Sequence, residues 1–279
     1  MRRTIALLTD FGLRDSFVGV MKGVIARIAS EANVIDISHA VPAQDVRAGA
    51  LMLHAGYRYF PADAIFVAVV DPGVGGARRP IAVRAGQQVF IAPDNGILSY
   101  VLQENTGVES RLLDNPAFHL PQVSSTFHGR DIFAPAAAHL AAGTAFDALG
   151  SPLTHWHLLE VPVLSAEGDR LRGEVLHIDH FGNVVTSIGR FQWLEDDHLR
   201  LEPAFGSALP ARVSLARRCA VTIGDTYLDG VRRTYSDAYP GAALALIGSS
   251  GFLELSINLG SFADVFDVHA GDSVILEAG

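Results

Sequence analysis

The sequence is poor in two reactive residue types, because it contains one cysteine, Cys219, and one lysine, Lys22. A single cysteine excludes an intrachain disulfide and a zinc site built from cysteines, and it fits a reducing compartment. Any Schiff-base chemistry would have to run through Lys22, since no other lysine is present.

Long apolar runs and positive charge are also scarce. No apolar run approaches the roughly 20 residues needed to span a bilayer. The segment Ile5–Leu8, which follows two arginines near the N-terminus, is too short for a signal peptide and is followed by Asp10. The formal net charge of −9 argues against a nucleic-acid binder, which would normally show a basic face. We expect a cytoplasmic protein that binds neither membranes nor nucleic acid.

What the chain does contain is enough apolar sequence for a large core. Its 279 residues are 49% hydrophobic, which suits one large core or two domains. Through about Gly150, strand-like and helix-like runs alternate, which predicts an α/β domain with a mostly parallel sheet flanked by helices. Later runs are short and β-type, which predicts a smaller all-β barrel or sandwich. We place a linker near 158–170 and expect domains at 1–160 and 170–279.

Hydrophobic periodicity predicts individual elements in both domains. In the first, we expect strands at Thr4–Leu8, Val34–Ile37, Ile65–Val70, Ile81–Arg84 and Val89–Ile91, with helices at 17–28, Val46–Tyr57 and Asp131–Ala142. In the second, we expect strands at Glu174–Ile178, Val184–Ile188, Arg212–Leu215, Ala220–Ile223, Ala243–Ile247, Leu253–Ile257 and Ser273–Glu277.

An apolar run that ends in a carboxylate is the most informative local feature. Ile65–Val70 is followed by Asp71, a glycine-rich turn, and the paired arginines Arg78 and Arg79. A carboxylate and a guanidinium seven residues apart can face each other across so compact a turn. Ligands of open α/β sheets bind at the carboxyl ends of strands, so this loop predicts half of an active site.

Four further clusters have the composition of sites. TDFG contains Asp10, followed by Asp15, and such carboxylates take ribose hydroxyls or metal ions, or cap a helix. APDNG has strong turn chemistry. STFHGRD places His128 at a helix start, where a packed core histidine is uncommon. HIDHFGN, with Asp179 and Asn183, can hold a purine or an amino-acid head group, or can simply decorate a hairpin loop.

These motifs occur in one order across nearly the whole chain: TDFG, DPGVG followed by RR, APDNG, STFHGRDIFAP, IDHFGN and IGSSGFLELSINLG. That order resembles the S-adenosyl-L-methionine (SAM) hydroxide adenosyltransferases, or SAM hydrolases, which are relatives of the bacterial fluorinase and chlorinase. The resemblance implies an α/β domain followed by a β-barrel domain, in a homotrimer whose active sites lie between subunits. It also implies attack of water or hydroxide at the ribose C5′ of SAM, giving adenosine and L-methionine without a cofactor.

The resemblance assigns the handling of water to Asp71, Arg78 and His128. Arg79 competes for the arginine role, but the seven-residue spacing favours Arg78. The halogenase branch lacks this trio, so its presence favours hydroxide over halide. The leaving thioether becomes neutral and needs no general acid, so the chemistry must activate water, either by an Asp–His base or by the charge of an arginine. The sequence leaves both routes open.

The resemblance also implies residues that contact the substrate. The ribose diol would be held by Asp10, the methionine amine and carboxylate by Asp15, Asp179 and Ser249, and adenine by Phe181 and Asn183, with Phe127 and Tyr235 as aromatic walls.

Three other readings remain open. One is a SAM-dependent halogenase-like transferase. Another is a metal-dependent hydrolase of a nucleoside-type substrate, in which Asp10, Asp71, His128 and Asp131 converge on a metal ion. The third is a non-catalytic sensor of SAM or adenosine, although a binder has no need for a trio that activates water.

Overall fold

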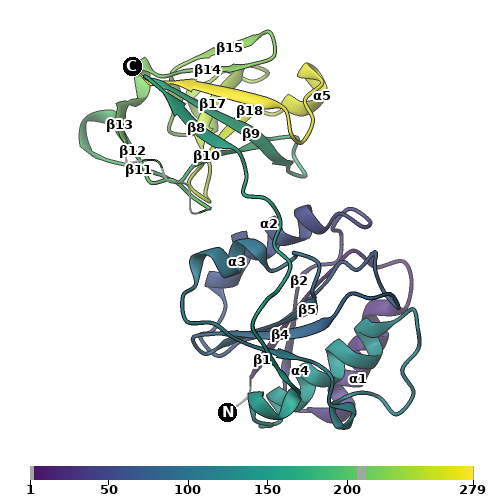
Figure 1. Cartoon of the computed structure of the whole chain (residues 1–279). Helices are drawn as coiled ribbons and strands as arrows, with labels where there is room; N and C mark the ends of the chain where they lie inside the picture. The colour runs from purple at the N-terminus through teal and green to yellow at the C-terminus, as the bar shows by residue number, and fades with distance from the viewer. Residues whose placement is uncertain (1–2, 206–208, 210–211, 279) are drawn as a thin grey trace. The chain divides into compact units, whose positions relative to one another are not determined.

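The computed structural model describes residues 3–205, 209 and 212–278 (Figure 1). The chain divides into two compact units, residues 1–159 and 160–279. Within the described residues, no helix combines the length and the hydropathy of a membrane span.

The first unit is built on a seven-stranded sheet with the order β2-β1-β3-β5-β4-β6-β7. Strands β2, β1, β3 and β5 run parallel to one another, whereas β4, β6 and β7 are joined to them and to each other by antiparallel pairs. The strands are β1 (Thr4–Thr9), β2 (Asn33–Ser38), β3 (Ile65–Val69), β4 (Pro80–Ala85), β5 (Gln88–Pro93), β6 (Glu109–Leu112) and β7 (Pro152–Leu153).

The sequence predicted a mostly parallel sheet, but three of the six strand pairs in this sheet are antiparallel. Between Ala85 and Gln88 the chain reverses in a two-residue turn, and Gly86 there has φ +60°. So short a connection can join only antiparallel neighbours, because a parallel pair requires a long crossover. β6 and β7 extend this β4–β5 hairpin with further antiparallel partners.

Helices cover both faces of this sheet (Figure 1). Alternate residues of β1 point to opposite faces, so Ile5 and Leu7 pack with α1 and α4, whereas Ala6 and Leu8 pack with α2 and α3. The helices are α1 (Phe17–Ile28), α2 (Val46–Gly56), α3 (Ser99–Glu104) and α4 (Ala134–Ala141), with 3-10 turns at Tyr57–Tyr59, Pro116–Phe118 and Phe146–Leu149.

The helix expected at Asp131–Ala142 begins differently. Gly129–Phe133 forms a π-helical turn, and α4 follows it directly. Such turns are rare and are frequent at functional sites. This one lies immediately after His128.

The second unit contains a nine-stranded sheet and a three-stranded sheet. The larger sheet has the order β15-β14-β19-β9-β10-β18-β17-β16, with β8 beside β9. It curls so that β15 contacts β17, which makes it a nearly closed, barrel-like sheet. The smaller has the order β11-β12-β13. The strands are β8 (Leu164–Glu167), β9 (Arg170–Ile178), β10 (Val184–Gly189), β11 (Phe191–Trp193), β12 (His198–Leu201), β13 (Arg212–Leu215), β14 (Ala220–Ile223), β15 (Thr226–Asp229), β16 (Val231–Arg232), β17 (Ala243–Ile247), β18 (Phe252–Ile257) and β19 (Ser273–Glu277).

Two details of the second unit depart from the sequence prediction. The expected linker near 158–170 contains β8, which pairs with β9 and so belongs to the sheet. A short helix, α5 (Phe262–Phe266), interrupts the strands, and 3-10 turns lie at Glu195–Asp197, Ala216–Arg218 and Tyr235–Asp237. Each of these short elements carries too few residues to show a hydrophobic period.

Candidate active site

Two carboxylates follow neighbouring parallel strands of the first unit. Thr9, the last residue of β1, is in register with Val69, the last residue of β3. Asp10 directly follows β1, and Asp71 lies two residues beyond β3. Both therefore lie at the same edge of the sheet, where the carboxyl ends of parallel strands form ligand sites.

Asp71 is paired with Arg78 in a largely buried ion pair. Arg78 Nε lies 2.9 Å from each carboxylate oxygen, and Nη2 also donates to Oδ2. The side chains of Asp71 and Arg78 are only 5% and 9% exposed. The guanidinium also lies over the ring of Phe133, with Cζ 5.4 Å from the ring centroid. Because a buried charge pair is costly to break, this geometry is strongly fixed.

The glycine-rich turn brings this pair against the loop that carries His128. A Cβ on Gly75 would lie 2.2 Å from the backbone oxygen of Ser125, and its φ is +75°. A Cβ on Gly73 would lie 3.2 Å from Arg78 Cγ. Only glycine fits at Gly75, both for its left-handed conformation and for the close approach of the two loops.

His128 completes the cluster through Arg78. Arg78 Nη2 donates to His128 Nδ1 at 2.7 Å, so the guanidinium bridges the carboxylate and the imidazole. Burial, and then the charge of Arg78, lower the pKa of His128 below its usual value. Since arginine can only donate, Nδ1 must accept, and the neutral ring carries its hydrogen on Nε2.

A buried carboxylate, Asp131, shapes the loop before His128. The Ser124 backbone N–H and hydroxyl donate to Asp131 Oδ2 at 2.8 and 2.7 Å, and Arg130 Nε donates to Oδ1 at 2.6 Å. Burial alone would raise the pKa of Asp131, but the hydrogen bonds from Arg130 and Ser124 outweigh it and lower that pKa. The carboxylate of Asp131 thus stabilises the loop between Ser124 and His128.

Arg79 points to a different set of partners. Its Nε donates to Asp94 Oδ2 at 2.9 Å, and its Nη2 donates to the backbone oxygen of His155 at 2.8 Å. Asp94 belongs to the APDNG turn, in which Asn95 Nδ2 donates to the Val70 backbone oxygen at 2.7 Å. Of the two adjacent arginines, it is Arg78 that contacts Asp71.

Asp10 is held from a second loop. Its Oδ2 accepts the backbone N–H of Gln44 at 2.8 Å, and Gln44 has φ +66°, an uncommon conformation for a residue other than glycine. Backbone strain of this kind is often found at functional sites. Asp15, the other carboxylate of this motif, is exposed ahead of α1.

Three phenylalanines pack edge to face beside this site. Phe127 lies 5.9 Å from Phe11 and 5.2 Å from Phe17, measured between ring centroids. A Cβ on Gly129 would lie 3.3 Å from the rings of both Phe11 and Phe127, so a larger residue there would disturb the packing. The predicted aromatic wall Phe127 is therefore part of an apolar cluster next to His128.

One predicted residue of the second unit, Tyr235, contacts a buried carboxylate, Glu254, that the sequence analysis did not single out. Tyr235 donates its hydroxyl to Glu254 Oε1 at 2.6 Å, and Ser256 Oγ donates to the same oxygen at 3.0 Å. Glu254 is 7% exposed. Burial, and then the Glu254 hydrogen bond, raise the pKa of Tyr235 well above its usual value, and Asp179 adds to the effect. A charged residue inside the apolar β18 pattern was the available signal.

The remaining predicted residues of this unit lie in turns. Asp179 accepts the Phe181 backbone N–H at 2.8 Å and the Asn183 side-chain amide at 2.9 Å, so the two polar residues lock one turn. Phe181 is 73% exposed at its tip. Ser249 is exposed in the turn between β17 and β18.

The metal-site hypothesis finds no support in the geometry. Asp71 and Asp131 are held by arginines, and within residues 3–205, 209 and 212–278 no three His, Cys, Asp or Glu side chains form a group that could hold a metal ion.

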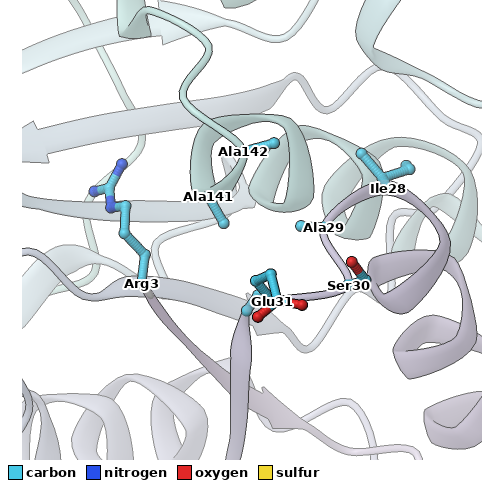
Figure 2. Close-up of a pocket in the computed structure, with 8 residues that line it drawn as sticks. Arg3, Ile28, Ala29, Ser30, Glu31, Ala141 and Ala142 are labelled. Carbon is cyan, nitrogen blue, oxygen red and sulfur yellow. The ribbon is translucent and has the colours of Figure 1, made fainter. Parts of the chain in front are cut away.

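A cavity of about 540 Å³ lies at the opposite edge of the sheet and is lined by Arg3, Glu31 and Ala141, among others (Figure 2). Its arginine donates to the backbone oxygens of Asp63 and Leu140. None of the predicted site residues lines this cavity.

Comparisons with known proteins agree with the order of the motifs. The family model for the SAM hydroxide adenosyltransferase N-terminal domain matches residues 5–150, and the C-terminal domain model of the same family matches residues 173–275. The (R)-S-adenosyl-L-methionine hydrolase of Salinispora arenicola (strain CNS-205) is 40% identical over 99% of this chain and 98% of its own.

Two further relatives are a fluorinase and a protein of known crystal structure. The fluorinase of Nocardia brasiliensis is 29% identical over 100% of this chain and 98% of its own. The crystal structure of an uncharacterized conserved protein from Thermotoga maritima is 35% identical, covers 98% of this chain and 99% of that chain, and superposes with a TM-score of 0.83.

Proposed function

Because the chain belongs to the SAM hydroxide adenosyltransferase family, we propose that it hydrolyses S-adenosyl-L-methionine to adenosine and L-methionine. Water or hydroxide attacks the ribose C5′, and the methionine thioether leaves. The hydrolase relative is more similar to this chain than the fluorinase is, which favours water over halide as the nucleophile.

The observation that carries the proposal is the contact of Arg78 with both Asp71 and His128. An ion pair within one turn meets a histidine 50 residues beyond its arginine, at the strand edge where α/β enzymes bind ligands. A structural ion pair needs no histidine beside it, whereas a site that orients water needs donors and acceptors together.

The tautomer of His128 favours one of the two routes for activating water. With Nδ1 occupied by Arg78, the neutral imidazole presents Nε2–H, which donates to water and cannot remove its proton. Asp71 keeps lone pairs that can accept from the same water. We therefore assign the activation to the Arg78 charge, which stabilises a hydroxide-like nucleophile. Holding that water in line with C5′ and sulfur supplies much of the remaining rate.

Substrate contacts follow the same assignment. Asp10 binds the ribose diol, Phe127 forms an apolar wall, and Asp15 lies toward the methionine end. In the second unit, Asp179, Phe181, Asn183, Tyr235 and Ser249 contact adenine and methionine. The reaction uses no cofactor in this account, because the departing thioether is neutral and SAM already carries the activated carbon.

The assembly and location are also part of the proposal. We propose a homotrimer in which the first unit of one subunit and the second unit of its neighbour share each substrate; family membership supports it. A cytoplasmic location is supported by the single cysteine. Light scattering on the purified protein measures the mass of the assembly, which should be three times that of one chain.

Product analysis tests the function. The protein is incubated with each sulfur epimer of SAM, with and without chloride or fluoride, and the products are separated chromatographically. We expect adenosine and methionine in equal amounts, faster from the (R) epimer because the relative's name specifies it. Asp71→Asn and His128→Ala should slow turnover by at least about 10²-fold while binding is retained. A 5′-halogenated adenosine formed at matching rates contradicts hydrolysis.

A further inference from the structure

His39, which follows β2, holds both ends of the short segment that contains Asp10. Its Nδ1 lies 2.8 Å from Thr9 Oγ1, and its backbone oxygen accepts the Gly12 N–H at 2.7 Å. Thr9 Oγ1 in turn accepts the Phe11 N–H at 3.2 Å. His39 is 5% exposed, so water competes little for these contacts.

The other side of the His39 ring faces a pair of charges. Nε2 lies 3.1 Å from Asp36 Oδ1, outside the alignment of a good hydrogen bond, and Lys22 Nζ donates to Asp36 Oδ2 at 2.7 Å. The negative charge of Asp36 favours a hydrogen on Nε2, which leaves Nδ1 to accept the Thr9 hydroxyl hydrogen. The ring orientation is thereby fixed from both sides.

We propose that His39 is a positioning residue for the ribose site, acting through Thr9 on the orientation of Asp10. The inference rests on the proposed function, in which Asp10 binds the ribose diol. Asp10 is anchored from Gln44 on one side. Its own backbone lies between Thr9 and Gly12, the two residues that His39 holds, so a change at His39 rotates the carboxylate away from the diol.

The chain offers a matched control for burial and charge. His54 on α2 is 4% exposed, its Nε2 lies 2.9 Å from Glu104 Oε1, and its ring packs against Tyr57 and Tyr100, which lie outside the segment around Asp10. His54→Gln therefore perturbs a buried histidine–carboxylate pair without touching the ribose site.

The test compares substrates with and without the ribose 2′-hydroxyl. The kcat/KM values for SAM and for its 2′-deoxy analogue are measured with wild type, His39→Gln, Thr9→Val, Thr9→Ser and His54→Gln. We expect His39→Gln and Thr9→Val to lose about 10- to 100-fold on SAM, mainly through KM, as for one charge-assisted hydrogen bond. On the deoxy analogue the loss should be at least about threefold smaller than on SAM, since the contact of Asp10 with the 2′-hydroxyl is already absent. Thr9→Ser, which keeps the hydroxyl, should behave like wild type.

Equal losses on both substrates contradict the proposal, because a general structural defect does not depend on the 2′-hydroxyl. If His39→Gln does not fold, the pair Thr9→Val and Thr9→Ser carries the same comparison. Calorimetry can compare the binding of adenosine and 2′-deoxyadenosine to the same variants without turnover. The effect of His39 on ribose binding is therefore measurable even if the protein does not hydrolyse SAM. Asp10→Asn separates the two hypotheses: if it keeps the preference for the ribo ligand, the ribose role of Asp10 itself is wrong.

Discussion

Gly75→Ala should separate the two loops that bring Arg78 and His128 into contact. The new Cβ would lie 2.2 Å from the Ser125 backbone oxygen, and real contacts of this kind are essentially never below 3.0 Å, so the loops must part by about 0.8 Å. Arg78 and His128 lie on these two loops, 2.7 Å apart at Nη2 and Nδ1. A separation of 2.7 Å plus 0.8 Å is about 3.5 Å, where a hydrogen bond is largely lost.

The expected loss follows from that displacement. Misplacing a catalytic group by about 1 Å costs about 10²-fold in rate, so kcat should fall by that order. The left-handed conformation adds a cost of about 1–2 kcal/mol to folding, because alanine has a Cβ. Steady-state kinetics and thermal unfolding measure the two effects separately.

Gly86→Ala is the matched control. Gly86 also has a positive φ, +60°, but a Cβ there meets nothing within 4 Å. It should therefore lose about 1–2 kcal/mol of stability and keep its kcat. If Gly75→Ala keeps kcat within about threefold of Gly86→Ala, the close approach of the two loops is not what the reaction needs.

The remaining predictions concern charge. The proposed mechanism requires neutral His128, whose pKa is lowered, so kcat/KM should rise with pH along a limb below about 6.5 and stay level above it. Arg78→Gln should move that limb to higher pH, and an NMR titration of the His128 ring measures the same shift. The same shift adds stability that is complete above about pH 6.5 and declines as pH falls through the folded-state pKa. Arg79→Gln removes the cationic partner of Asp94, whose side chain is only 4% exposed, so the free energy of unfolding should fall by about 1–3 kcal/mol while turnover is kept. Glu254→Gln should lower the pKa of Tyr235 toward its usual value in a tyrosine NMR titration.

Local chemistry made one part of the site predictable from sequence. Asp71 and Arg78 lie at the two ends of one turn. The end of the strand before Asp71, the glycines of the turn and the seven-residue spacing were therefore enough to predict that the two side chains pair. His128 is 50 residues beyond Arg78, and only the order of the motifs linked it to that turn. Its contact with Arg78 is seen in the structure, whereas its role in the reaction stays a proposal.

Long-range pairing explains what was missed. Whether a strand pair is parallel or antiparallel depends on both partners, so the alternation of elements could not reveal the antiparallel pairs that β4, β6 and β7 make. β8 has four residues and no strong period, and its sheet position depends on β9. Glu254 acquires its importance only when Tyr235 folds onto it.

Hydrolysis in water enriched in ¹⁸O shows whether solvent oxygen attacks C5′ of the substrate. Attack at C5′ places the solvent oxygen in the 5′-hydroxyl of adenosine and none in methionine. We expect one ¹⁸O atom per adenosine, formed with an equal amount of unlabelled methionine. Unlabelled adenosine, or a product that retains the bond between C5′ and sulfur, contradicts it.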